Sequence, residues 1–207
     1  MSSKRASQDD LKAGPYDPAP AARLAARALR GAQIPGALAG RIAVWQYVSD
    51  PSQRGPADAL IMAVQRAVGS ALAAWLERKG FHVESHSNGG VCVSTDQGVS
   101  VHFVHGAGRA ADVSGLYASA VAAAHEQERL AQVGEEALFL APPEHLLAME
   151  LAGAGREHER DARRLLARPE LDVEKLRQLL HDHVGTLGVS KLDLLLPEVR
   201  RPGRHAR

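Results

Sequence analysis

Three short runs of alternating or β-branched residues, one directly after another, constrain the fold of this chain most strongly. They are FHVESHS, GVCVSTD and VSVHFVH, and the segments NGG and DQG that separate them are turn signals. Runs of this length joined by tight turns pair most simply as an antiparallel meander. Because helical patterns lie on both sides of this β segment, the sequence predicts a mixed α/β fold.

The first 80 residues predict helices and short apolar strands in alternation. After a proline-punctuated leader, an amphipathic helix is expected over residues 21–32, and a short apolar strand should end before Gly40. RIAVWQYV then favours a helix start, SDPSQRGP a loop and ADALIMAV a buried strand. The clearest helical pattern runs from Gln65 to Lys79, and Gly80 is placed for a left-handed C-cap.

The chain becomes wholly helical from residue 142 onward. Before that point, residues 107–124 are ambiguous between loop and helix, and EEALFLA predicts one more strand. Asp172 is placed to cap one C-terminal helix, and Ser190 to cap another that ends near Pro197. The expected organisation is a disordered leader (1–18), an α/β domain (19–141), a helical C-terminal region of the same unit (142–198) and a basic tail (199–207).

Composition bears on the compartment and on the partners of the protein. Hydrophobic residues make up 45% of the 207 residues, enough for a real core, and a net charge of +1 gives no overall reason to expect a nucleic acid or a membrane. No run approaches the roughly 20 apolar residues that span a bilayer. Cys92 is the only cysteine, and its VCV context predicts a buried small hydrophobe. We therefore expect a bacterial cytoplasmic protein without a membrane partner.

Four strings, in this order, carry a resemblance to a known family: IPGALAGRIAV, RGPADALI, LERKGF and APPEHLLAMELAGAGREHERDARRLL. They are similar to motifs of the nucleotidyltransferase superfamily, specifically of its small bacterial abortive-infection and toxin–antitoxin branch. The motifs are an opening strand with a glycine turn, an Arg-x-Thr-x-Asp-x-Asp strand, the close of the next helix, and a Pro-Glu-x-Leu-x-x-x-Lys-Leu segment before an Arg/Asp-rich helix pair. The resemblance implies a nucleotidyltransferase-like mixed sheet flanked by helices, with a helical C-terminal region.

The family's chemistry depends on acidic side chains. Two carboxylates on one strand and a third from a neighbouring strand hold Mg²⁺ ions, which bind a nucleoside triphosphate and activate the attacking hydroxyl. The resemblance places Asp58 at the first carboxylate, as catalytic residue and metal ligand. Leu60 then stands at the second position, and His102 at the third, catalytic one. Leucine cannot ligate a metal and imidazole suits softer ions than Mg²⁺.

The nucleotide-binding candidates follow from the same resemblance. Gly40 matches the first of two turn glycines that let the backbone approach phosphates, and Arg41 occupies the second. Arg54 matches the arginine of the strand motif. A purely structural role is also open for each of Arg41, Asp58 and His102.

We therefore expect a catalytically degenerate nucleotidyltransferase-fold protein with a binding or regulatory role in a toxin–antitoxin or defence system. One alternative is an active enzyme that uses Mg²⁺ with a nucleoside triphosphate to modify RNA or protein, recruiting Asp50 or Asp112. The other is an interaction module without cofactor or nucleotide, whose protein partner comes from the same operon.

Two further groups of residues have both a structural and a functional interpretation. His82, Glu84 and His86 alternate and could share a sheet face as zinc ligands, but a polar edge strand is the simpler interpretation. The arginines at 156, 160, 163 and 164 fall on one side of a helix, where they could contact RNA. Because acidic residues are interleaved with them, a salt-bridged solvated surface is favoured.

Overall fold

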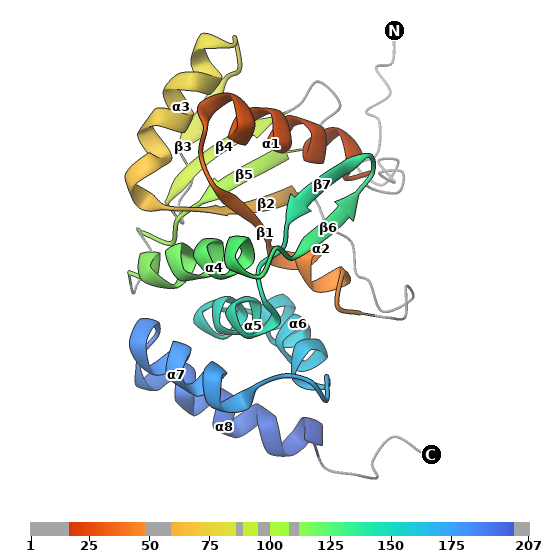
Figure 1. The fold of residues 1–207 in the computed structure, drawn as a ribbon. Coiled ribbons are helices and arrows are strands. Elements are labelled where there is room, and N and C mark those ends of the chain that lie inside the picture. The colour runs from red at the N-terminus through yellow and green to blue at the C-terminus, as the bar shows by residue number, and fades with distance from the viewer. Residues whose placement is uncertain (1–16, 49–58, 86–88, 95–99, 108–111, 201–207) are drawn as a thin grey trace, which may run out of the picture.

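The computed structural model describes residues 17–48, 59–85, 89–94, 100–107 and 112–200. Its centre is a five-stranded sheet in the order β1-β2-β5-β4-β3 (Figure 1). β3, β4 and β5 form the predicted antiparallel meander, while β2 pairs antiparallel with β1 and parallel with β5, which makes the sheet mixed. The strands are β1 (Gly36–Ala39), β2 (Ala59–Val64), β3 (Val83–Ser85), β4 (Gly90–Ser94) and β5 (Ser100–Val104).

Helices cover both faces of this sheet (Figure 1). α1 (Ala19–Ala32) and α3 (Gly69–Arg78) lie on one face, and α2 (Gly40–Trp45) and α4 (Ser114–Glu126) lie on the other. A short 3₁₀ turn (Arg66–Val68) precedes α3, so this helix begins later than its apolar pattern predicts. It ends as expected at Gly80, whose φ of +84° suits a left-handed C-cap.

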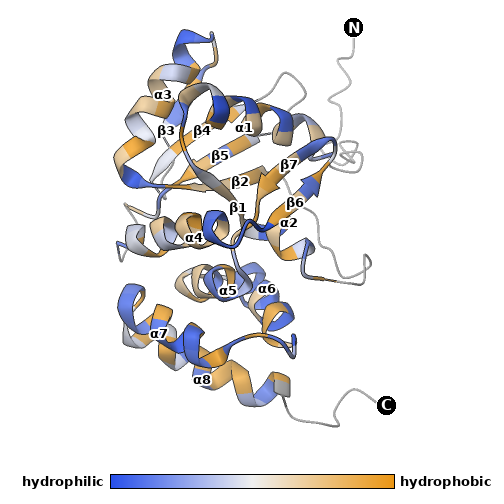
Figure 2. Ribbon diagram, viewed as in Figure 1, coloured by the Kyte–Doolittle hydropathy of each residue, from blue (hydrophilic) through white to orange (hydrophobic). Residues whose placement is uncertain are grey.

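Four further helices form the C-terminal region below α2 and α4 (Figure 1). They are α5 (Pro143–Ala152), α6 (Arg156–Leu166), α7 (Val173–His183) and α8 (Thr186–Arg200). α5 is buried along nearly its whole length because it packs against α4 on one side and against the other three helices on the other. In Figure 2, hydrophobic residues concentrate on the sheet strands, whereas hydrophilic and hydrophobic residues alternate along α7 and α8. The expected fold class, a mixed sheet flanked by helices with a helical C-terminal region, is confirmed.

One local prediction is confirmed with an addition, and one is wrong. The strand expected in EEALFLA is confirmed as β7 (Glu136–Phe139). It pairs with β6 (Leu130–Val133), which was not predicted, in a separate two-stranded sheet. The prediction that Ser190 caps the last helix is wrong, because α8 begins directly after Gly185, whose φ is +82°, and continues through Pro197. By contrast, the Asp172 cap is confirmed: its Oδ1 accepts a hydrogen bond of 3.0 Å from the Lys175 backbone N–H.

Among the described residues, no helix combines the length and the apolar character that crossing a bilayer requires.

Candidate functional site

The candidate site lies on the face of the sheet that carries α2 and α4. Four residues stand side by side across this face in register: Ile61 on β2, His102 on β5, Cys92 on β4 and Glu84 on β3. Because side chains alternate along a strand, paired residues of neighbouring strands share a face. Ile61, His102 and Cys92 are half-buried and Glu84 is exposed, so helices cover this row only in part.

Gly40 begins α2 directly beside this row. Its φ is +63°, and a Cβ built there would lie 2.7 Å from Cδ1 of Ile61. Glycine is therefore required by the backbone conformation and by the close approach of a neighbouring side chain. The expected turn glycine is in place, and packing against Ile61 suffices to explain it.

Leu60 does not lie on this face, so the expectation that Leu60 and His102 stand at two positions of one metal site is wrong. Leu60 pairs with Val101, and both are 0% exposed on the face that α1 and α3 cover. The residue beside His102 is Ile61, so the β2 positions that face the site are Ala59 and Ile61. A shift of one residue moves every side chain of a strand to the other face. The string ALIMAV does not show which of its residues face the site, because the side chains on both faces of this strand are apolar.

Most of the remaining candidate residues lie in segments that the structure does not describe. Asp58, Arg54 and Asp50 lie outside the described residues. Asp112 forms an ion pair of 3.1 Å with Arg66, which follows the C-terminal end of β2, whereas position 58 adjoins the N-terminal end of that strand. In the described strands, Glu84 is the one carboxylate on the His102 face.

His102 projects from the middle strand of the sheet. Its Nε2 lies 3.0 Å from Oγ of Ser100, two residues earlier on β5 and on the same face. The ring is half-buried. A serine hydroxyl and an imidazole can exchange a hydrogen bond, but neither is a preferred ligand of Mg²⁺.

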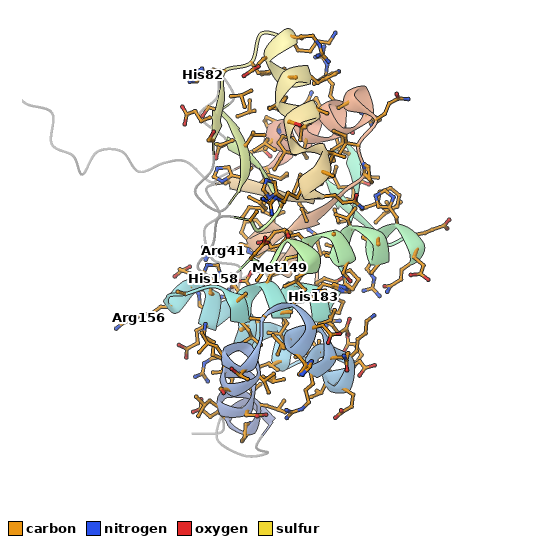
Figure 3. The ribbon with its side chains drawn as sticks, turned by 90° about the vertical axis from the view of Figure 1, so that its left-hand side faces the viewer. Arg41, His82, Met149, Arg156, His158 and His183 are labelled. Carbon is orange, nitrogen blue, oxygen red and sulfur yellow. The ribbon has the colours of Figure 1, made fainter. Side chains whose placement is uncertain are left out.

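Arg41 points away from the sheet, into the junction with the helical region (Figure 3). Its Nε lies 3.1 Å from Oδ2 of Asp161 on α6, and its Nη2 also pairs with Glu157. Asp161 is only 2% exposed and holds Arg164 as well, at 2.6 Å. Burial alone would lower the pKa of Arg41, but the hydrogen bond and the charge of Asp161 raise this pKa above its ordinary value. A phosphate at Arg41 would have to compete with these two carboxylates.

The sequence analysis did not identify Asp161 and Glu157 as partners of Arg41. Their signal is the spacing of four residues within an arginine-rich helix, which places both carboxylates on one side of α6. The partner on α2 lies 120 positions earlier than Asp161, and no local pattern connects them.

Cys92, His82 and Glu84 form no metal site with other residues in the described part of the chain. Cys92 is half-buried, not buried as expected, because β4 turns Val93 to the covered face instead. Burial and then the charge of Glu84 raise the pKa of Cys92, which favours the unreactive thiol. His82 precedes β3, is exposed and lies 3.5 Å from Glu84, and His86 lies outside the described residues. Across the described ranges, no three His, Cys, Asp or Glu side chains cluster as metal ligands would.

No protein-family model and no curated protein matches the sequence. Among solved structures, the chain is similar to the antibiotic-resistance factor ANT(2'')-Ia, with 11% identity and a TM-score of 0.49 over 84% of this chain and 97% of that one. It is also similar to an antigenic nucleotidyltransferase-like protein from Paracoccidioides brasiliensis, with 16% identity and a TM-score of 0.42 over 86% of this chain and 90% of that one. Neither similarity is high enough to transfer an activity, a substrate or a site residue to this chain.

Proposed function

We propose that this protein is a nucleotidyltransferase-type domain that has lost metal-assisted nucleotidyl transfer and acts by binding. Its role is regulatory, within a bacterial toxin–antitoxin or defence system, together with a protein partner from the same operon. The observation that carries the proposal is the position of Ile61 beside both Gly40 and His102.

Nucleotidyl transfer of the family's kind needs oxygen ligands on this face. Mg²⁺ demands a nearly ideal octahedron of oxygen atoms, and carboxylates supply the protein's share. Ala59 and Ile61 offer hydrocarbon at the β2 positions, and His102 offers nitrogen on β5. Leu60, on the other face, is hydrocarbon as well, so no described residue of β2 and no residue at position 102 supplies a carboxylate to accompany Asp58.

The contacts of Arg41 support the same conclusion. An arginine beside a glycine turn can bind a phosphate bidentately. Here the guanidinium instead joins α2 to α6 through Asp161 and Glu157. In this proposal, the arginine at the phosphate-facing turn has become a link between the sheet and the helical region.

Labelling experiments test the loss of transfer. The purified protein is incubated with Mg²⁺ or Mn²⁺, nucleoside triphosphates labelled at the α-phosphate, total RNA and a protein extract. We expect no label transfer above that of a sample without protein. Metal-dependent labelling that disappears in Asp58→Ala and persists in Asp112→Ala would contradict the proposal. Asp112 is a suitable control because it is exposed and lies beyond the opposite end of β2.

Thermal unfolding measures binding separately from transfer. A ligand at 100 times its Kd stabilises the folded state by about 2.7 kcal/mol. We expect any stabilisation by a nucleoside triphosphate to be the same with and without Mg²⁺, because the protein lacks the carboxylates that would bind the metal together with the nucleotide. Stabilisation that requires Mg²⁺ would contradict this.

A further inference from the structure

A cleft of about 530 Å³ lies between the C-terminal end of α5, the start of α6 and the middle of α8. This volume is within the range of small-molecule sites. The cleft is formed by the helical region alone, so it is separate from the sheet face described above. Its lining combines a buried carboxylate, several cations, further acidic residues and the exposed side chain of Leu194.

A fixed imidazole is the first feature of the cleft. Glu150 is 7% exposed, and its Oε2 accepts a hydrogen bond of 2.6 Å from Nδ1 of His158. The ring also lies against Gly153, where an added Cβ would come within 2.6 Å of its Cγ. The carboxylate and the backbone thus fix the ring from two sides. Its Nε2 has no hydrogen-bond partner among the described residues, and the side chain is 40% exposed.

Two cations with hydrogen-bonding capacity to spare line the same cleft as this ring. Arg156 is exposed and forms no ion pair with any described residue. Lys191 donates to the carbonyl oxygens of Leu151 at 2.8 Å and Gly153 at 2.7 Å, and an ammonium group has a third N–H. In Figure 3, Arg156 and His158 project from the same end of α6.

The acidic residues at the rim are already engaged. Arg163 lies 2.8 Å from both Glu159 and Glu198, so its single positive charge offsets part of their negative charge and engages an oxygen of each. In the imidazolium form, both nitrogens of His158 donate, and Nδ1 is held by Glu150. Arg156, Lys191 and the protonated ring of His158 therefore offer donors to a ligand, and a small anion is the ligand that these three groups fit.

The wall on α8 is apolar. Leu194 is 71% exposed, an unusual position for a large hydrophobic side chain, and Leu195 lines the cleft next to it. Burial of such a side chain against a ligand is favourable in proportion to the area removed from water. We propose that this cleft binds a phosphate monoester with an apolar or aromatic substituent: the phosphate contacts Arg156, His158 and Lys191, and the substituent covers Leu194.

Isothermal titration calorimetry with phenyl phosphate tests the proposal on the full chain. We expect saturable binding with one ligand per chain, weaker binding of inorganic phosphate, and no binding of phenol. Arg156→Gln and His158→Asn should each weaken the binding by about tenfold, the loss of one charge-assisted hydrogen bond. Asparagine keeps a nitrogen at the place of Nδ1 for Glu150 and removes Nε2.

Arg160→Gln is the matched control, since Arg160 lies one turn along α6, pairs with Glu157 and does not line this cleft. It should bind phenyl phosphate as the unmodified chain does. Absence of saturable binding, or equal binding by the Arg156→Gln and unmodified chains, would overturn the proposal. If inorganic phosphate binds as tightly as phenyl phosphate, the proposed role of Leu194 is overturned. If phenol binds as tightly as phenyl phosphate, the proposed role of the cations is overturned.

Discussion

Acid should destabilise this protein through His145, a residue of α5 that is only 2% exposed. Its Nε2 lies 3.1 Å from Oγ of Ser119 on α4, and its Nδ1 has no hydrogen-bond partner in the described part of the chain. We infer that Nε2 of the neutral ring carries the proton and donates to Ser119, because buried N–H groups without an acceptor are rarer than under-satisfied acceptors. Protonation of Nδ1 would create such an N–H group.

The size of the effect follows from the pKa. Burial, and then the positive charges of Lys175 and His183, lower the pKa of His145 from 6.5 to about 4. Between these values the unfolded chain binds a proton that the folded chain does not bind, so this contribution to stability is complete above pH 6.5 and is lost as the pH falls toward 4. At 1.36 kcal/mol per pH unit, the loss by pH 4 is about 3 kcal/mol. A domain of this size has only about 5–15 kcal/mol in total.

Urea unfolding between pH 7 and pH 4 measures this loss, with His145→Gln as the reference. Glutamine does not titrate and can place its amide nitrogen near the position of Nε2, within reach of Ser119. The unfolding free energy of the unmodified chain should fall by about 3 kcal/mol more than that of the variant over this range. His82→Gln, at an exposed histidine, should follow the unmodified chain. Parallel curves for the unmodified chain and His145→Gln would refute the reasoning.

Three further substitutions test the packing of the site by urea unfolding at pH 7. Gly40→Ala should lower the unfolding free energy by about 1–2 kcal/mol for the left-handed backbone, and by more because the new Cβ clashes with Ile61. Adding Ile61→Val should recover part of this loss. Independent, additive losses from the two substitutions would contradict the contact. Asp161→Ala should cost about 1.5–3 kcal/mol because it removes the buried carboxylate that pairs with both Arg41 and Arg164. Glu157→Ala, at an exposed position, should cost less than about 1 kcal/mol, and equal costs would be inconsistent with this. Tyr47→Phe should lower the unfolding free energy by about 1–3 kcal/mol, because the hydroxyl donates to the Ala141 carbonyl and accepts from Arg129. An unchanged unfolding free energy would show that neither hydrogen bond stabilises the fold.

Local patterns in the sequence predict most of the elements. The meander follows from alternation and turn residues, α3 follows from its apolar spacing, and the helical C-terminal region follows from its periodicity and its Asp172 cap. β6 was not predicted because its alternation covers only four residues, Leu130–Val133, next to an ambiguous segment. Elements of this kind depend on a partner strand, here β7, more than on their own composition.

Two features of the site could not be predicted from the sequence, each for a physical reason. β2 is apolar on both faces, so its sequence cannot show that Ile61, and not Leu60, lies beside His102; the pairing with β5 decides it. The partners of Arg41 come from α6, and only the packing of the helical region against α2 brings Asp161 and Glu157 within reach. Position 40 could be predicted as glycine-dependent, but its packing partner could not.

The most direct test of a divalent-metal site beside His102 is a titration of the purified protein with Mn²⁺. The electron paramagnetic resonance signal measures the concentration of the free ion. Mn²⁺ accepts the same oxygen ligands as Mg²⁺. We predict no saturable site with a Kd below about 10⁻⁴ M, because Ala59, Ile61 and His102 supply no carboxylate on that face. One or two equivalents of Mn²⁺ bound more tightly than this, and released in Asp58→Ala, would contradict it.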